Sequence, residues 1–234
     1  SAAEMERAFG IPSIADHYTQ IASAIRGTIR EKYWDATRGL FADTYDHRSF
    51  SQHVNSLAIL AGIVTGEEAT RVMERTLNDS SLIQATIYFR YYVHQALKVA
   101  SMGDHLLDNL QIWRDQMALG LTTWAEMPEP TRSDCHAWGA SPNIEFYRIL
   151  LGIDSDAPGF RKIRIAPSLG KLKEVSGTIP HPLGSVTAAY KLDERGEGTA
   201  RLVLPEGTTG IFIWDGKEIP LKPGEQVISL SLRH

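Results

Sequence analysis

The sequence has little cysteine and no long run of residues of one kind. Cys135 is the single cysteine among 234 residues, which excludes an internal disulfide and a zinc site built on several cysteines. Lys and Arg number 24 against 28 Asp and Glu, a formal net charge of −4, and no basic cluster has the character of a nucleic-acid or anionic-membrane surface. No apolar stretch approaches the roughly 18–20 residues of a membrane span. We therefore expect neither a nucleic acid nor a membrane as a partner.

The N-terminus lacks the features of a secretory signal. Residues 1–7, SAAEMER, have no positively charged region leading into an apolar one, so they do not form a signal peptide. We expect this start to lie inside a longer protein whose own leader is not part of the sequence. The compartment is left open between cytoplasmic, periplasmic and secreted.

The first 153 residues have the apolar spacing of helices. From Ile14 to Tyr33 apolar residues recur every three or four positions, which marks one helix face. Five further helices are predicted at residues 51–63, 66–77, 86–100, 104–119 and 135–151. Strongly apolar helices alternate with amphipathic ones, a pattern typical of helical hairpins arranged as an inner and an outer layer.

Beyond Gly152 the apolar period changes from helical to two. Residues 154–159 (DSDAPG) are predicted to be a linker. Period-two runs follow, separated by turn residues such as Pro-Glu-Gly and Asp-Gly, at 162–166, 185–192, 199–204, 210–214 and 227–232. Short strands at this spacing predict an antiparallel β-sandwich. The chain is thus expected to contain two domains, a helical one at 1–153 and a β-sandwich at 154–234.

The residues best suited to chemistry gather in one loop before the last predicted helix. Within about nineteen residues from Gly120 the loop contains Trp124, Glu126, Glu129, His136 and Trp138. Tryptophan beside carboxylates suits sugar binding, since the ring covers C–H groups and carboxylates accept hydrogen bonds from hydroxyls. Glycoside hydrolysis also needs a carboxylate pair. The alternative is a solvated polar loop in which Asp134 caps the following helix, and the spacing leaves both open.

Other polar residues are candidates for binding or metal roles. His53 at a predicted helix start and Tyr88 in an aromatic run are candidates for lining a pocket, although such residues also serve as ordinary core. No histidine pair has the His-x-x-x-His spacing of a zinc site, and the aspartates at 35, 43 and 46 lack the spacing of a calcium loop. No metal or cofactor is expected. Cys135 has no thiolate activator nearby in sequence, which favours a buried, unreactive thiol.

Four segments resemble a known family. These are residues 50–58 (FSQHVNSLA), 120–126 (GLTTWAE), 129–142 (EPTRSDCHAWGASP) and 150–167, which includes LLGI and APGFRKIRIAP. Together they are similar to bacterial α-L-rhamnosidases of glycoside hydrolase family 78, over nearly the whole chain. The resemblance implies an (α/α)₆ barrel followed by a C-terminal β-sandwich. It also implies inverting hydrolysis of terminal α-L-rhamnose by a glutamate acid and a glutamate base.

The resemblance also implies roles for single residues. The base follows a Gly-x-Thr-Thr signature, which places it at Glu126, with Glu129 as a competitor. Trp124, His136 and Trp138 would shape the rhamnose pocket, together with His53 and Tyr88.

The family's acid lies earlier in the barrel than this chain extends, since only 125 residues precede Glu126. About six helices also make half of a twelve-helix barrel. We therefore expect a C-terminal fragment that carries the base, is inactive alone, and packs on the missing barrel half or self-associates. A non-catalytic carbohydrate-binding or interaction module and another glycosidase with this barrel are the alternatives.

Overall fold

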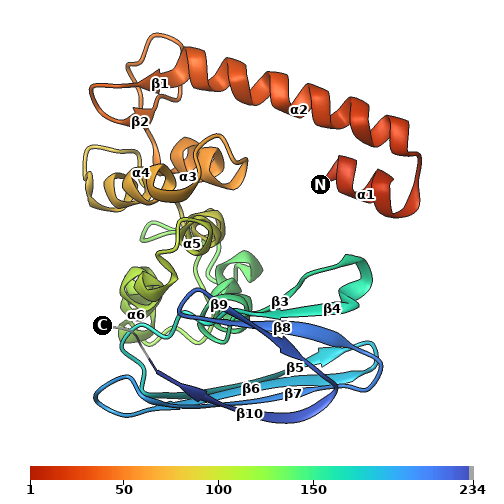
Figure 1. Ribbon diagram of the computed structural model, residues 1–234. Helices are drawn as coiled ribbons and strands as arrows, with labels where there is room; N and C mark the ends of the chain where they lie inside the picture. Colours follow the sequence, from red (N-terminus) through yellow and green to blue (C-terminus); the bar gives the residue numbers. More distant parts are fainter. Residues whose placement is uncertain (232–234) are drawn as a thin grey trace. The chain divides into compact units, whose positions relative to one another are not determined.

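The computed structural model describes residues 1–231. Within this range the chain forms two compact units, Ser1–Met102 and Gly103–His234, the second of which is described as far as Ser231 (Figure 1). No helix in the described part of the chain is both long enough and apolar enough to cross a membrane.

The first unit is mostly helical. It contains a two-stranded hairpin, β1 (Trp34–Asp35) paired with β2 (Leu40–Phe41), and five helices: α1 (Ala2–Phe9), α2 (Pro12–Tyr33), α3 (Gln52–Leu60), α4 (Gly66–Asn78) and α5 (Arg90–Val99). The Ser51 side chain caps α3 by accepting a hydrogen bond from the Val54 amide, which satisfies a donor at the helix start. The helices predicted around 14–33, 51–63, 66–77 and 86–100 are therefore present, the second and the last shorter than predicted.

The apolar core of this unit lies between α3, α4, α5 and the hairpin. Phe41, Ile59, Met73 and Leu97 are among its fully buried side chains. Helix α2 contributes only its C-terminal end, where Ile29 packs against this cluster. Towards its N-terminus the same apolar stripe faces solvent.

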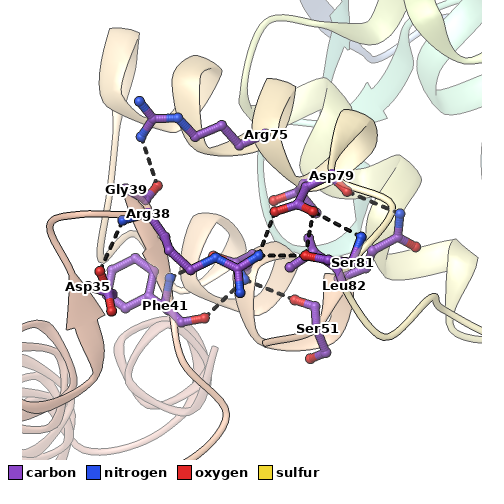
Figure 2. Close-up of polar contacts among 12 residues, drawn as sticks. Asp35, Arg38, Gly39, Phe41, Ser51, Arg75, Asp79, Ser81 and Leu82 are labelled. Atoms are coloured by element: carbon purple, nitrogen blue, oxygen red, sulfur yellow. Dashed lines mark hydrogen bonds and ion pairs between the residues drawn. The ribbon is translucent and has the colours of Figure 1, made fainter. Parts of the chain in front are cut away.

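A polar cluster joins the β1–β2 turn to the end of α4 (Figure 2). The Arg38 guanidinium donates to Asp79 at 2.6 Å and to Ser81 at 2.7 Å, while Arg75 on α4 donates to the Gly39 carbonyl at 3.2 Å. Hydrogen bonds from the Ser81 hydroxyl and then from Arg38 lower the pKa of Asp79. These contacts fix the β1–β2 turn against the C-terminal end of α4.

The second unit begins with short helical segments. In order they are η1 (Gly103–His105), η2 (Leu107–Asn109), α6 (Gln111–Ala118), η3 (Ala137–Ala140), α7 (Pro142–Glu145) and η4, a π-helical turn (Phe146–Leu150). The sequence predicted two continuous helices over 104–119 and 135–151. Neither helix is continuous, so both predictions are wrong on this point. Two 3₁₀ turns occupy the start of the first segment, and a 3₁₀ turn and a π turn flank α7 in the second.

Two four-stranded sheets form the rest of this unit. One has the order β10-β7-β6-β5 and the other β3-β4-β8-β9. The strands and a 3₁₀ turn are β3 (Ile153–Ser155), η5 (Pro158–Phe160), β4 (Lys162–Ile165), β5 (Glu174–His181), β6 (Gly184–Leu192), β7 (Gly198–Leu204), β8 (Thr209–Trp214), β9 (Lys217–Leu221) and β10 (Gly224–Leu230). The predicted run at 227–232 ends at Leu232, which lies outside the described residues.

The two sheets enclose one apolar core. Ile163 and Phe212 from one sheet and Tyr190 and Leu202 from the other are fully buried in the same cluster. A helical part followed by a β-sandwich confirms the predicted fold class. The sandwich is not wholly antiparallel, however, because β4 pairs with β8 in parallel: residues 166–208 separate these strands and form most of the opposite sheet, so β8 returns beside β4 in the same direction.

The segment predicted to be a linker is part of the sandwich. Residues Ile153–Ser155 form β3 and pair with β4, and Asp154 also forms an ion pair with Arg148. Helical structure therefore gives way to strands at the expected position near 153. The compact units divide earlier, at Met102, because the segment before β3 is bonded to the sandwich: the Tyr190 hydroxyl donates to the Leu151 carbonyl at 2.8 Å. The domain division at 153/154 stays a prediction.

Candidate functional site

The loop that holds the candidate carboxylates is anchored to α6. The buried Gln116 side chain accepts a hydrogen bond from the Ala125 amide at 2.9 Å and donates one to the Ala125 carbonyl at 3.2 Å. At the other end of the loop, the Trp113 ring nitrogen donates to the Gly139 carbonyl at 2.6 Å. One turn of helix thus fixes the residue before Glu126 and the start of the following helical segment.

The two arms of the loop are also bonded to each other. The His136 amide donates to the Trp124 carbonyl at 2.7 Å, and the Glu126 amide donates to the Ser133 carbonyl at 2.9 Å. The Thr123 hydroxyl donates to the Asp134 carbonyl at 2.6 Å. These bonds bring residues that are seven to twelve positions apart into one small region.

Glu126 faces Arg132 across the loop. The Arg132 Nε donates to Glu126 Oε2 at 3.1 Å, and a terminal guanidinium nitrogen contacts Oε1. The Glu126 side chain is 17% exposed, whereas that of Arg132 is 76% exposed. The hydrogen bond from Arg132, together with its charge and that of His136, lowers the pKa of Glu126. The carboxylate is therefore ionised near neutral pH and able to accept a proton.

Glu129, the other candidate, lies in a different environment. Its side chain is exposed, and its carboxylate accepts a hydrogen bond from the Thr131 amide two residues on, at 3.3 Å. It thus stabilises the local turn. Two glutamates three residues apart therefore have different partners, and the environment of Glu126 is the one suited to holding a base.

The aromatic candidates of the loop lie on both sides of Glu126 in the sequence and differ in how far they are exposed to solvent. Trp124 and His136 are half-buried, and Trp138 is 68% exposed. The rings of His136 and Trp138 meet edge-on with centroids 6.4 Å apart. Such an exposed indole beside an imidazole offers an apolar face and a hydrogen-bonding group to a ligand.

The remaining two candidates, His53 and Tyr88, lie in the first unit. Both contact Phe89, whose ring centroid is 4.2 Å from that of His53 and 6.1 Å from that of Tyr88. Burial lowers the pKa of His53, and the negative charge of Asp43 opposes this. The structure thus brings these two candidates together around Phe89, and it places them in a different unit from the loop.

Sequence reasoning missed several contributors. Gln116, Arg132 and Phe89 were assigned no role, although Arg132 was visible as a cation in the loop. Nothing in a single sequence shows that a cation six residues after a glutamate turns back to it. Cys135 was expected to be buried, and it is exposed. Its neighbours at 134 and 137 are exposed as well, so this side of the loop faces solvent.

Among residues 1–231, no group of three or more His, Cys, Asp or Glu side chains is placed to hold a metal ion. A hollow of about 640 Å³ lies beside the sandwich, between α7–η4 and strands β3 and β5. Its lining includes Tyr147, Phe160 and the Arg148–Asp154 pair. None of its lining residues belongs to the 120–138 loop.

Residues 152–224 match the family model described as bacterial alpha-L-rhamnosidase C-terminal domain. The resemblance to α-L-rhamnosidases is confirmed. No curated protein matches the sequence significantly.

Solved α-L-rhamnosidase structures share the fold. The chain is similar to the native enzyme from Aspergillus terreus, with 16% identity, a TM-score of 0.81, and coverage of 97% of this chain and 28% of that one. It is similar to the rhamnosidase of Bacillus sp. GL1, described as family GH78, with 24% identity, a TM-score of 0.68, and coverage of 87% and 22%.

The Streptomyces avermitilis α-L-rhamnosidase, solved in complex with L-rhamnose, gives 18% identity, a TM-score of 0.72, and coverage of 99% and 25%. The chain therefore spans between a fifth and a third of the length of these structures. Because they come from Aspergillus as well as from Bacillus and Streptomyces, a bacterial origin stays a prediction.

Proposed function

We propose that this chain is the C-terminal part of an α-L-rhamnosidase and that Glu126 is its general base. The observation that carries the proposal is the Glu126 carboxylate itself. It is mostly buried and is held by Arg132, and it follows the GLTT segment on which the family resemblance rests. Residues 1–153 would form half of an (α/α)₆ barrel, and residues 154–234 the sandwich.

In this proposal Glu126 removes a proton from the water that attacks the anomeric carbon of terminal α-L-rhamnose. An inverting enzyme holds its two carboxyls about 6.5–9.5 Å apart, which leaves room for that water. The acid that protonates the leaving oxygen would be supplied by the part of the enzyme outside this chain. Trp124, His136 and Trp138 would contact the sugar, whereas the roles of His53 and Tyr88 stay predictions from the family resemblance.

The decisive experiment compares two glutamates of the same loop in the complete enzyme. Glu126→Gln keeps the size of the side chain but removes the base, so kcat on an aryl α-L-rhamnoside should fall by about 10²–10⁴-fold or more, while KM changes little. Glu129→Gln is the matched control and should retain near-normal turnover. The reverse result would assign the base to Glu129.

A second measurement separates lost chemistry from lost structure. Azide is an anionic nucleophile that needs no deprotonation, so it should restore part of the turnover in a Glu126→Ala variant. A misfolded site would not respond to azide. If neither glutamate variant affects turnover, the chain is better described by the alternative, a carbohydrate-binding or interaction module without catalytic groups.

A further inference from the structure

We propose that Arg132 is the positioning residue of this site, holding the Glu126 carboxylate in one orientation through contacts to both of its oxygens. The inference rests on the proposed function of Glu126 as the base. It extends that function to a residue that had been assigned no role from the sequence.

The geometry of the contact is that of a guanidinium fork. Nε of Arg132 reaches one carboxylate oxygen of Glu126 at 3.1 Å, and a terminal nitrogen reaches the other. A two-point contact of this kind fixes the plane of the carboxylate as well as its position. Lysine, a single ammonium on a flexible stem, cannot reproduce it.

The loop backbone builds this contact. The Glu126 amide donates to the carbonyl of Ser133, the neighbour of Arg132. The Thr131 hydroxyl also donates to the Ser133 carbonyl, at 3.1 Å. Arg132 thus lies between two residues that are bonded to each other, one of which is also bonded to the Glu126 backbone. The pairing therefore follows from the folded loop rather than from the chance reach of a long side chain.

The two side chains differ in exposure, which indicates that Arg132 stabilises the ionised form of Glu126 rather than the reverse. Glu126 is 17% exposed and Arg132 is 76% exposed, so the carboxylate is the group that has lost most of its water. A carboxylate with little water needs a cation or hydrogen-bond donors to stay ionised. Arg132 supplies both from the solvent side while filling little of the interior.

The fork leaves the base able to work. An ionised carboxylate has about four lone-pair sites, of which Arg132 uses two. The others remain available to accept a hydrogen bond from a water molecule. Among the described residues, His136 is the other charged group whose field acts on Glu126, and it acts in the same direction as Arg132.

The first test is a titration on the 234-residue chain, with ¹³C-labelled glutamate and the Glu126 carboxyl assigned by its loss in Glu126→Gln. In wild type it should titrate below the ordinary value of about 4.3. In Arg132→Met its pKa should rise towards the ordinary value, with Arg132→Lys in between. If Arg132→Met does not fold, Arg132→Lys alone carries the test.

The matched control is the exposed Arg201–Glu225 pair of the same unit, bonded at 2.6 Å across β7 and β10. Arg201→Met removes the same charge and should leave Glu126 unchanged. A Glu126 titration that is the same in wild type and in the Arg132 variants overturns the proposal. So does an equal shift caused by Arg201→Met, because the effect would then be general rather than local.

The second test follows the pH profile of kcat/KM in the complete enzyme. Because the base must be ionised, its acidic limb should move to higher pH in Arg132→Met by the same amount as the titration, and less in Arg132→Lys. A loss of kcat/KM at every pH, with the acidic limb of the profile at its wild-type position, would indicate a merely structural role and overturn the proposal. Normal turnover by Glu126→Gln would instead contradict the proposed function, independently of whether Arg132 controls the titration.

Discussion

At the scale of single residues, the roles are decided by partners rather than by residue type. Glu126 and Glu129 are chemically equivalent and lie in one short loop. Glu126 pairs with Arg132 while mostly buried, and Glu129 is exposed and bonded to its own turn. The sequence identified the loop and both carboxylates. It could not choose between them on physical grounds, because the choice depends on how the loop closes on itself.

Asn55 shows how one buried polar residue joins two elements. It is fully buried on α3. Its side chain accepts from the Phe41 amide at 2.8 Å and donates to the carbonyls of Phe41 at 3.1 Å and Ser51 at 2.9 Å. It thereby satisfies the backbone of β2 on the side away from β1. In the sequence, such a residue is visible only as a polar position within an otherwise apolar segment.

Asn55→Ala should therefore destabilise the first unit. The Phe41 amide and carbonyl would be left buried without partners, which lowers the free energy of unfolding by about 1–3 kcal/mol. Asn78→Ala, at an exposed residue that bonds only to the Glu74 carbonyl, is the control and should change it by no more than about 0.5 kcal/mol. Urea denaturation followed by circular dichroism measures both. Equal effects would show that the Asn55 bonds carry no net stability.

At the scale of elements, the period-two pattern predicted most strands of the sandwich but not those of the short hairpin. Strands β4, β6, β7, β8 and β10 were predicted, whereas β1, β2, β3, β5 and β9 were not. The three sandwich strands that were missed all lie at sheet edges, as does β10, which was predicted. Pro180 in β5 and Pro220 in β9 also obscure the pattern, since proline is tolerated in edge strands. The parallel β4–β8 pair depends on long-range topology, which no local period contains.

The junction between helix and sandwich depends on a glycine. Gly152 has φ +73°, and a Cβ there would lie 2.1 Å from the carbonyl carbon of Ala166. The Gly152 carbonyl also accepts a bond from the Ala166 amide at 3.0 Å. A left-handed backbone and the close approach of the segment at Ala166 therefore both require glycine at this position.

Gly152→Ala should destabilise the second unit by more than the roughly 1 kcal/mol that a positive φ alone costs. Gly216→Ala is the matched control, because Gly216 has φ +71° with open space where its Cβ would be. Thermal unfolding followed by near-ultraviolet circular dichroism should show the larger drop in Tm for Gly152→Ala. Equal drops would mean that the contact with Ala166 relaxes without cost.

At the scale of the whole molecule, the surface contains an apolar stripe that nothing in the first unit covers. Tyr18, Ile21 and Ile25 on α2 are 39%, 43% and 53% exposed, and only Ala15 of this helix is fully buried. The sequence predicted a helix with one apolar face. The helix is present, but a single sequence cannot show what covers that face, because burial depends on neighbours that are distant in sequence or lie in another chain.

We expect this stripe to cause self-association of the 234-residue chain. Ile14, Tyr18, Ile21 and Ile25 follow a 4-3-4 spacing along one face of α2, which suits packing against a second helix. Exposed apolar patches beyond a few hundred Å² generally mark interaction sites, and a two-fold dimer is the commonest closed arrangement of identical chains. Light scattering coupled to size-exclusion chromatography, over a range of concentrations, should therefore show a mass above that of the 26.0 kDa monomer.

Two double variants on α2 locate the interface. Ile21→Glu with Ile25→Glu places two charges in the stripe and should return the chain to a monomer without loss of helix content. Gln20→Glu with Ser23→Glu adds the same charge at exposed polar positions of the same helix and should leave association unchanged, because those side chains lie off the stripe. A wild-type chain that stays monomeric at the highest concentration, or a complex that survives the isoleucine changes, would show that α2 does not hold the copies together.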